Sequence, residues 1–221
     1  EVGHSADKDV LMIRTNKRDV VTEQFRMLRT NIQYMVNDKT TPVILVTSTF
    51  SGEGKSFVSI NTGAVMALAG KRTVVLELDI RKPKIASNLN LSRTRGISNF
   101  LVGSVKVESL PLPVPGIDNL YVLPCGAVPP NPSEMLLSEK LAELFAYVKE
   151  AFDVVIIDTA PVGLVSDSFT LSRYADSTLY IVRMGYTLKK QMHFIQELYS
   201  NNKLPRIGLL VNDIKTSSHY Y

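Results

Sequence analysis

The sequence of 221 residues holds a single cysteine, Cys125, and no tryptophan. One cysteine excludes an internal disulfide bond and a zinc site built on several thiolates, and it fits a reducing compartment. Cys125 follows an apolar run and a proline, so we expect a buried small side chain rather than a nucleophile. No apolar run approaches the roughly 18 residues that a membrane-spanning helix needs, and no secretory signal opens the chain, so we expect this chain to be soluble.

A large excess of one charge sign is also missing, because 25 basic residues and 21 acidic residues give a formal net charge of only +4. The basic residues are scattered rather than gathered with aromatic residues in one stripe, which argues against a nucleic-acid partner. With 45% hydrophobic and 21% charged residues, the composition excludes disorder and low complexity and predicts one sizeable core.

Short apolar runs alternate with amphipathic stretches along the chain. The runs at 43–47, 73–78, 120–123, 154–157, 178–182 and 207–211 are mostly continuous, as in parallel strands that are covered on both faces. The stretches with helical spacing are 20–34, 55–69, 133–151, 166–174 and 188–200. This alternation predicts a three-layer α/β fold in which helices cover a mainly parallel central sheet. The proline-rich segments 110–115 and 124–132 are expected to be ordered loops.

A glycine-rich loop, Ser51-Gly-Glu-Gly-Lys-Ser56, stands between the first of these strands and an apolar helix. Gly52 and Gly54 allow the backbone to turn its N–H groups toward an anion, and the positive end of the helix dipole adds to this cradle. Lys55 can reach the β- and γ-phosphates of a nucleotide, and Ser56 can offer its hydroxyl to Mg²⁺. Strand, loop and helix together predict a P-loop, against the alternative of a glycine-rich turn with an incidental lysine.

Acidic residues end two of the predicted strands. Asp158 closes the apolar run 154–157 in the manner of a Walker B carboxylate, and Glu77 and Asp79 stand at the end of the run 73–78. Two acids near a phosphate site suit metal binding and the orientation of a nucleophilic hydroxyl. The alternatives are that Asp79 only caps the following turn and that Glu77 pairs with a surface lysine.

Three segments resemble the nucleotide motifs Walker A, A′ and B of the bacterial tyrosine kinases (BY-kinases), the cytoplasmic kinase domains of exopolysaccharide and capsule co-polymerases. They are the loop 51–56, the segment Glu77-Leu-Asp-Ile-Arg-Lys-Pro83 and the segment Ile157-Asp-Thr-Ala-Pro161. The larger group includes MinD- and ParA-like P-loop ATPases, which carry a signature lysine where this chain has Phe50. Thr49 stands at the first glycine of the standard P-loop pattern. The missing lysine favours the kinase over the ATPase.

Two further segments extend the resemblance. Glu23, Arg26 and Arg29 fit the family's E-x-x-R-x-x-R motif, which mediates ring-shaped oligomers, and an ordinary salt-bridged helix face is the alternative. The sequence ends on Ser-His-Tyr-Tyr, which resembles the start of the C-terminal tyrosine cluster that these kinases autophosphorylate. The tyrosines that the resemblance marks for autophosphorylation are Tyr220 and Tyr221.

The resemblance implies an ATP-dependent protein tyrosine autokinase that phosphorylates C-terminal tyrosines in trans within a ring and regulates exopolysaccharide or capsule synthesis and export. The implied partners are further copies of the chain, a membrane-embedded co-polymerase segment, fused or separate, and a cognate tyrosine phosphatase, at the cytoplasmic face of the bacterial inner membrane. We accordingly assign residues 1–18 to an N-terminal arm, 19–214 to the P-loop kinase domain and 215–221 to a tyrosine tail. Two other functions stay open: a MinD- or ParA-like ATPase switch, and a nucleotide-dependent scaffold without catalysis.

The resemblance also implies ATP or ADP and Mg²⁺ as ligands. The ATP-binding residues would be Ser51, Gly52, Glu53, Gly54, Lys55, Ser56, Phe57 and Asn212, the metal residues Ser56, Asp79 and Asp158, and the catalytic residues Lys55, Glu77, Asp79 and Arg81. We expect Asp79 to accept the tyrosine proton, since Glu77 replaces the family's usual aspartate and would contact the metal through water or hold Lys55. Asn212 would read the adenine edge, with a strand-end turn residue as the alternative. Arg81 would bind a phosphate or a partner's carboxylate, with a solvated turn arginine as the alternative.

Overall fold

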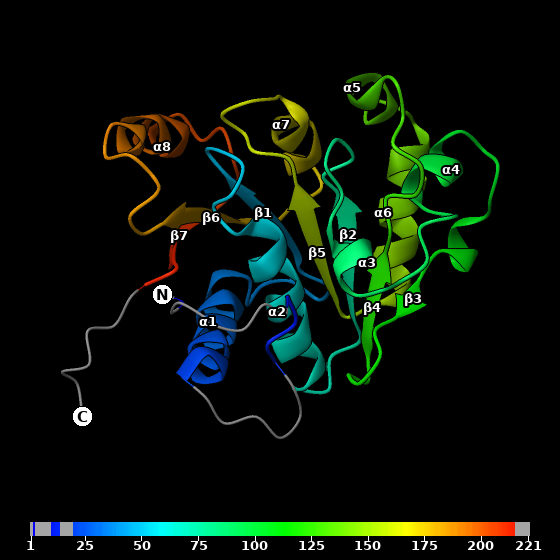
Figure 1. Ribbon diagram of the computed structural model, residues 1–221, viewed down its shortest axis with the longest axis horizontal. Helices are drawn as coiled ribbons and strands as arrows, with labels where there is room; N and C mark the ends of the chain where they lie inside the picture. The colour runs from blue at the N-terminus through cyan, green and yellow to red at the C-terminus, as the bar shows by residue number, and fades with distance from the viewer. Residues whose placement is uncertain (1, 3–9, 14–19, 215–221) are drawn as a thin grey trace.

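A central sheet of seven strands organises the protein, seen here in a computed structural model that describes residues 2, 10–13 and 20–214 (Figure 1). The strands are β1 (Val43–Ser48), β2 (Thr73–Leu78), β3 (Leu112–Pro113), β4 (Leu120–Leu123), β5 (Val154–Thr159), β6 (Ser177–Arg183) and β7 (Ile207–Asn212). Their order across the sheet is β3-β4-β2-β5-β1-β6-β7, and every pair is parallel except β3 with β4. The carboxyl ends of β1, β2 and β5 therefore meet at one edge of the sheet.

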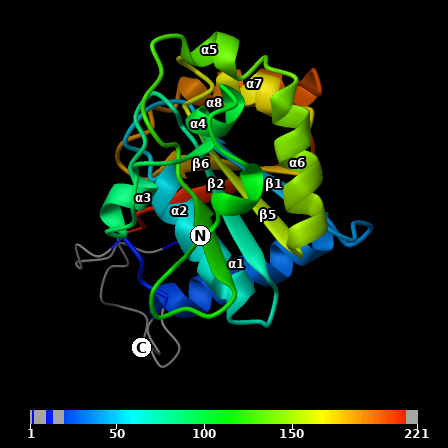
Figure 2. The ribbon, with the colours of Figure 1, turned by 90° about the vertical axis from the view of Figure 1, so that its right-hand side faces the viewer.

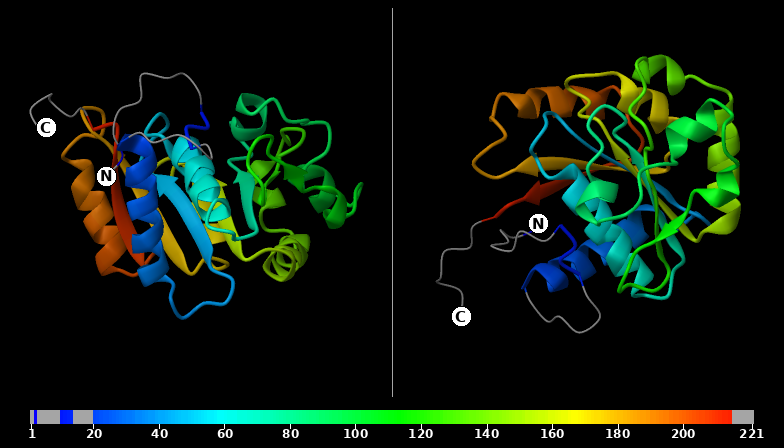
Figure 3. Two further views of the ribbon diagram at one scale, coloured as in Figure 1. Left: turned by 90° about the horizontal axis from the view of Figure 1, so that it is seen from below. Right: turned by 45° about the vertical axis from the view of Figure 1, so that its right-hand side comes forward.

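Helices cover both faces of this sheet (Figures 1 and 2). They are α1 (Val20–Met35), α2 (Lys55–Ala67), α3 (Ile85–Asn88), α4 (Ile97–Leu101), α5 (Pro132–Met135), α6 (Lys140–Ala151), α7 (Asp167–Ser172) and α8 (Gln191–Ser200), with the 3₁₀ turn η1 (Val107–Ser109). α1 and α2 lie side by side on one face, and α3 joins the same apolar cluster (Figure 3). α4, α6, α7 and α8 pack on the other face. The expected three-layer α/β fold is confirmed.

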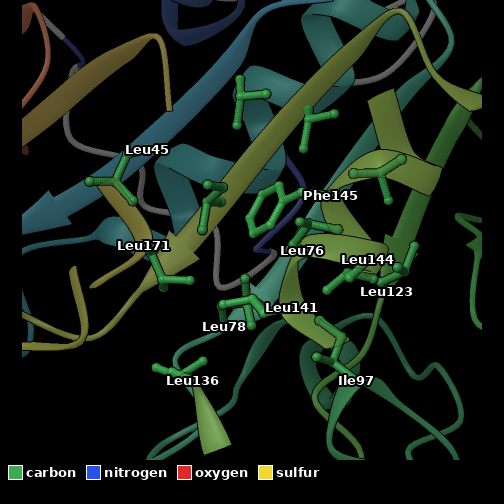
Figure 4. Packing of buried hydrophobic residues seen from close by; sticks show 14 of the residues in the cluster. Leu45, Leu76, Leu78, Ile97, Leu123, Leu136, Leu141, Leu144, Phe145 and Leu171 are labelled. Atoms are coloured by element: carbon green, nitrogen blue, oxygen red, sulfur yellow. The ribbon is translucent and has the colours of Figure 1, made fainter. Parts of the chain in front are cut away.

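The core is divided between the two faces because neighbouring strand residues point to opposite sides. Leu45 and Leu76 pack with Phe145 of α6 on one face (Figure 4), whereas Ile44 packs with Val58 of α2 on the other. All residues of β1, β2 and β5 are buried. Burial on both faces explains why these strands appear in the sequence as continuous apolar runs.

The predicted helix 133–151 is wrong in its length, because the structure has two helices there, α5 and α6. The chain turns between them so that Leu136 is fully buried while Leu137 stays 65% exposed. Ser138 Oγ accepts a hydrogen bond from the backbone N–H of Lys140 at 3.3 Å, just where the second helix begins. The turn between the two helices thus places Leu136 in the core, and α6 begins as a separate helix at Lys140.

The crossover from β2 to β4 holds short elements that the sequence pattern did not predict, namely α3, α4, η1 and β3. β3 lies in the proline-rich segment 110–115 and pairs antiparallel with β4, with Leu112 opposite Val122 and Pro113 opposite Tyr121. A proline is compatible with this place because β3 is the outermost strand of the sheet.

The described part of the segment expected to be an N-terminal arm packs against the domain. The N–H of Val2 donates to the carbonyl of Val211 at 2.9 Å, beside the edge strand β7. Asn61 Oδ1 accepts hydrogen bonds from the backbone N–H groups of Met12 at 2.8 Å and Ile13 at 3.1 Å. The side chains of Met12 and Ile13 are buried. Residues 1, 3–9 and 14–19, and the tail 215–221, lie outside the described residues.

Candidate active site

The glycine-rich loop joins β1 to α2 with two glycines in the left-handed region. Gly52 has φ 87°, and Gly54, at the start of α2, has φ 100°. A Cβ atom on Gly54 would lie 2.0 Å from Nδ2 of Asn212. Both the backbone angle and this close approach require glycine at position 54.

Glu53 stabilises the loop from its buried side. Its side chain is fully buried, and Oε2 accepts a hydrogen bond from the backbone N–H of Phe50 at 2.7 Å. Its other oxygen, Oε1, accepts one from Thr187 Oγ1, and its carbonyl accepts one from Asn212 Nδ2 at 3.0 Å. Glu53 and Asn212, both expected to contact ATP, therefore shape the loop from behind.

The segment after β6 holds the outer side of the same loop. Arg183 Nη1 donates to the carbonyl of Gly52 at 2.9 Å, while its Nε is paired with Asp213 Oδ2 at 2.8 Å. The hydroxyl of Tyr186 donates to the carbonyl of Ser51 at 3.0 Å. Neither Arg183 nor Tyr186 was predicted as a site residue, because no local pattern connects them to a loop more than 130 residues earlier.

Lys55 is 6% exposed at the first position of α2, and its Nζ donates to Ser48 Oγ at 3.3 Å. Burial lowers the pKa of this ammonium group, the nearby positive charge of Lys84 lowers it further, and the carboxylates of Asp158 and Asp79 act in the opposite direction. An anion placed in the loop would restore the charged form of Lys55.

Asp158, near the end of β5, is held by two hydroxyl groups of α2. Ser56 Oγ donates to Oδ2 at 2.8 Å and Ser59 Oγ donates to Oδ1 at 2.9 Å. Burial raises the pKa of Asp158 to about 7, although the hydrogen bond from Ser56 works against this. Ser59 was not predicted, and its signal is the spacing of three from Ser56, which places both hydroxyls on one side of the helix.

Glu77 and Asp79 differ in their surroundings. Glu77 is fully buried on β2, where Oε1 accepts the N–H of Ala86 at 3.2 Å and Oε2 accepts the N–H of Cys125 at 2.9 Å. The alternative that Glu77 pairs with a surface lysine is therefore wrong. Asp79 is half-buried, and its Oδ1 accepts the N–H of Lys82 at 3.1 Å.

Cys125, next to Glu77, is buried as expected. Burial raises the pKa of its thiol to about 12, and the neighbouring charge of Glu77 adds to the rise. A thiol with such a pKa stays protonated near neutral pH, so it is a poor nucleophile.

Arg81 turns toward α7 and α5. Its Nε is paired with Asp167 Oδ2 at 2.8 Å, and its Nη2 donates to Ser133 Oγ at 2.7 Å. Asp167 is 1% exposed, so the guanidinium charge of Arg81 is compensated by a buried carboxylate of the same chain. The alternative of a solvated turn arginine is wrong.

One cavity of about 280 Å³ connects the P-loop to the end of β2. Seven predicted site residues line it: Ser51, Gly52, Gly54, Lys55, Ser56, Phe57 and Asp79. Four residues that were not predicted complete its lining: Val10, Lys82, Lys84 and Asn88. Glu53, Glu77, Arg81, Asp158 and Asn212 act behind this surface through the contacts given above.

The donors at this edge of the sheet suit Mg²⁺ that arrives with a nucleotide. The hydroxyl of Ser56 is bonded to the carboxylate of Asp158, and Asp79 lines the same cavity. Within the described ranges, no three His, Cys, Asp or Glu side chains gather into a metal cage. Mg²⁺ in nucleotide sites commonly takes one or two carboxylates and completes its shell with phosphates and water, which matches this donor set.

The predicted oligomerisation residues lie on α1. Arg26 forms an exposed ion pair with Glu23 one turn earlier. Arg29 Nη1 donates to the carbonyl of Val65 on α2 at 3.4 Å. Tyr220 and Tyr221 lie outside the described residues, and among the described helices none is long and apolar enough to cross a membrane.

Comparison with known proteins gives one family model, the CobQ/CobB/MinD/ParA nucleotide binding domain, which matches residues 44–220. The tyrosine-protein kinase YwqD of Bacillus subtilis is 32% identical over 205 residues, which cover 93% of this chain and 86% of that relative. Tyrosine-protein kinase wzc of Salmonella typhi is also 32% identical, but the matched region spans only 28% of its length.

Two solved structures are similar over nearly the whole chain. The chimerical protein CapA2B2 has a TM-score of 0.88 and 28% identity, covering 97% of this chain and 94% of its own. The kinase domain of the Escherichia coli tyrosine kinase ETK has a TM-score of 0.87 and 25% identity, covering 100% of this chain and 91% of its own.

Proposed function

Because the chain belongs to the bacterial tyrosine kinases within the CobQ/CobB/MinD/ParA nucleotide-binding family, we propose that it transfers the γ-phosphoryl group of ATP to tyrosine hydroxyls. One observation carries the proposal: a single cavity is lined by the P-loop with Lys55 and by Asp79, which directly follows β2. Phosphoryl transfer needs this combination of charge stabilisation and positioning more than it needs covalent catalysis.

The nucleotide phosphates would lie on the backbone N–H groups of the loop 51–56, with Lys55 against the β- and γ-phosphates. The contacts of Glu53 to Phe50 and Thr187 support this role, because they hold the loop open without its own side chain entering the cavity. Contact between Asn212 and adenine stays a prediction.

Tyrosine needs help to attack, since its hydroxyl has an unperturbed pKa of about 10. Asp79 accepts the phenolic proton while the phenolate oxygen bonds to the γ-phosphorus. The bond from that phosphorus to the bridging oxygen breaks, and ADP leaves with the electron pair. Lys55 stabilises the charge that develops on the transferred group.

Mg²⁺ would be held by Ser56, Asp158 and Asp79 together with the phosphates, and when bound it neutralises phosphate charge. Glu77 is a positioning residue in this scheme. Its two hydrogen bonds tie β2 to the backbone at Ala86, which follows Asp79 in the chain, and at Cys125, which follows β4.

The wider assignment follows the family resemblance. The acceptors would be Tyr220 and Tyr221 of a neighbouring copy in a ring held by Glu23, Arg26 and Arg29. A co-polymerase segment in the bacterial inner membrane, fused or separate, and a cognate phosphatase would control this cycle at the cytoplasmic face, and with it exopolysaccharide or capsule export. The matched relatives include both a kinase of nearly this length and one much longer, which suits either arrangement.

Incubation with labelled ATP and Mg²⁺, followed by mapping of phosphotyrosine, tests the proposal. We expect label on Tyr220 or Tyr221, and a loss of at least roughly a hundredfold in Lys55→Met because a charge at the transferred group is removed. The matched control is Lys71→Met, since Lys71 is exposed on the turn before β2, at the opposite end of that strand from Asp79.

Two other outcomes would replace the kinase assignment. Hydrolysis of ATP without tyrosine label would indicate a MinD- or ParA-like switch, which Phe50 argues against because those ATPases carry lysine there. Binding of ATP without turnover would indicate a scaffold.

A further inference from the structure

The chain that follows the predicted base carries charge of one sign as far as residue 107. Residues 80–107 include six basic residues and no acidic one. Arg81 is the first of them, and Asp167 compensates its charge. Lys82 and Lys84 are exposed, line the active-site cavity, and form no ion pair with any residue in the described part of the chain.

These two lysines line the same cavity as Asp79, the predicted base. The cavity is lined by the loop 51–57 and by the segment that runs from Asp79 to Asn88. The backbone N–H of Lys82 donates a hydrogen bond to Asp79 Oδ1 at 3.1 Å, so the backbone of this lysine lies directly beside the predicted base. If the loop holds the nucleotide, an acceptor whose hydroxyl reaches Asp79 enters a cavity whose lining includes Lys82 and Lys84.

We propose that Lys82 and Lys84 select anionic acceptor segments, in which a phosphorylated or acidic residue stands beside the tyrosine that is to be phosphorylated. This inference rests on the proposed kinase function. Two ammonium groups that have no carboxylate partner among the described residues favour a neighbouring negative charge, and a phosphate dianion more strongly than a single carboxylate.

The sequence suggests which anion is used. Residues 214–221, Ile-Lys-Thr-Ser-Ser-His-Tyr-Tyr, contain no acidic residue, whereas Tyr220 and Tyr221 are adjacent. Phosphorylation of one tyrosine would create the negative charge that the lysines bind, so the second transfer is faster than the first. The two tyrosines would then be phosphorylated cooperatively.

The opposing interpretation is that both lysines bind the phosphates of ATP. Lys84 lies close enough to Lys55 to disfavour the protonated form of that side chain, so its charge is felt at the P-loop. The two interpretations differ in which Michaelis constant the lysines set, that for the acceptor or that for ATP.

The test uses the full chain and synthetic peptides of residues 214–221. The peptides carry at position 220 the native tyrosine in phosphorylated form, or the substitutions Tyr220→Glu and Tyr220→Phe, so that Tyr221 is the single free acceptor. The measured quantity is kcat/KM for each peptide at saturating ATP, together with KM for ATP. Enzymes compared are the unchanged chain, the double variant Lys82→Gln with Lys84→Gln, and Lys149→Gln, which removes an exposed lysine on the distant helix α6.

We expect the unchanged chain and Lys149→Gln to prefer the phosphorylated peptide over the Tyr220→Phe peptide roughly tenfold, and the double variant to use both alike. A gain with the Tyr220→Glu peptide as well would identify any neighbouring anion as the signal, and a gain with phosphotyrosine alone would identify the dianion. Both results support the proposal.

Equal use of all peptides by an active unchanged enzyme overturns the selection of anionic acceptors and leaves the kinase assignment standing. A raised KM for ATP with unaltered peptide preference assigns the lysines to the nucleotide and also overturns it. Failure to phosphorylate any tyrosine, in the peptides or in the chain itself, would instead sink the kinase function.

Discussion

At the scale of single residues, the proposed metal ligand Asp158 shows what burial does to a carboxyl group. Its carboxylate is buried and is held by the hydroxyls of Ser56 and Ser59, and burial raises its pKa to about 7. A charged carboxylate there costs free energy until a cation or further donors compensate it.

The sequence predicted which residues form this site, but it did not predict their hydrogen-bond partners. Asp158, Lys55 and Asp79 follow from their places at strand ends and in a glycine loop. The sequence could not indicate that Glu77 bonds to the backbone at Ala86 and Cys125, because those partners are brought near only when the crossover folds over β2. Hydrogen bonds between segments far apart in the chain leave no local pattern.

A pH-dependent stability follows from Asp158. Its pKa is raised in the folded state, from 3.8 to about 7, so the folded chain binds this proton more tightly than the unfolded chain. The stabilising effect of the proton is complete below about pH 4 and is lost as pH rises toward 7. We expect Asp158→Asn to be more stable than the unchanged chain at pH 8, by on the order of 2–4 kcal/mol, and the difference to shrink toward pH 5.

Urea unfolding at pH 5 and pH 8, with nucleotide absent and divalent cations chelated, measures this effect. The control is Asp118→Asn, because Asp118 is exposed on the loop before β4. If the free energy of unfolding had the same pH dependence in the unchanged chain and in Asp158→Asn, the raised pKa of Asp158 would be refuted.

At the scale of secondary-structure elements, length and burial decide what a sequence pattern can predict. Six strands were predicted close to their observed bounds, since each is an apolar run between turns. α3 and α4 have four and five residues, too few for a 3.6-residue period to be recognised. The interruption between α5 and α6 was missed because Leu136 continues the apolar spacing across it while the backbone turns.

Asn61 of α2 connects elements that the sequence pattern treats as separate. Besides accepting from Met12 and Ile13, its Nδ2 donates to the carbonyls of Val10 at 2.7 Å and Phe57 at 2.8 Å. The side chain is buried. Val10, which it holds, lines the active-site cavity.

We expect Asn61→Ala to lower the free energy of unfolding by about 2–3 kcal/mol, because buried backbone groups lose their partners. Amide hydrogen exchange at Met12 and Ile13 should accelerate together with the loss of stability. Asn31→Ala is the matched control, since Asn31 is exposed on the neighbouring helix α1. Unchanged exchange at both amides would show that Asn61 does not hold this segment.

At the scale of the whole molecule, the candidate active site lies at one edge of the sheet, and the proposed assembly motif lies on helix α1, which covers one face of that sheet. The pair between Arg26 and Glu23 is exposed, with 40% and 57% of the two side chains accessible. Exposed ion pairs contribute only about 0–1 kcal/mol, so this one can be exchanged for a contact between copies at little cost. Arg26 and Glu23 could thus take part in the proposed assembly without any change in the fold.

Tail phosphorylation should loosen such an assembly. Each phosphate adds roughly −1.5 to −2 charges, and a tail with both tyrosines phosphorylated has no hydroxyl left to offer Asp79, so it no longer occupies the neighbouring site as an acceptor. We expect light scattering to show a larger mass after treatment with a tyrosine phosphatase than before it. Lys55→Met, which never acquires label, should have the larger mass with or without the phosphatase, and Arg26→Ala with Arg29→Ala should stay small in both states. An identical mass for the phosphorylated and dephosphorylated chain would contradict the link between tail and ring.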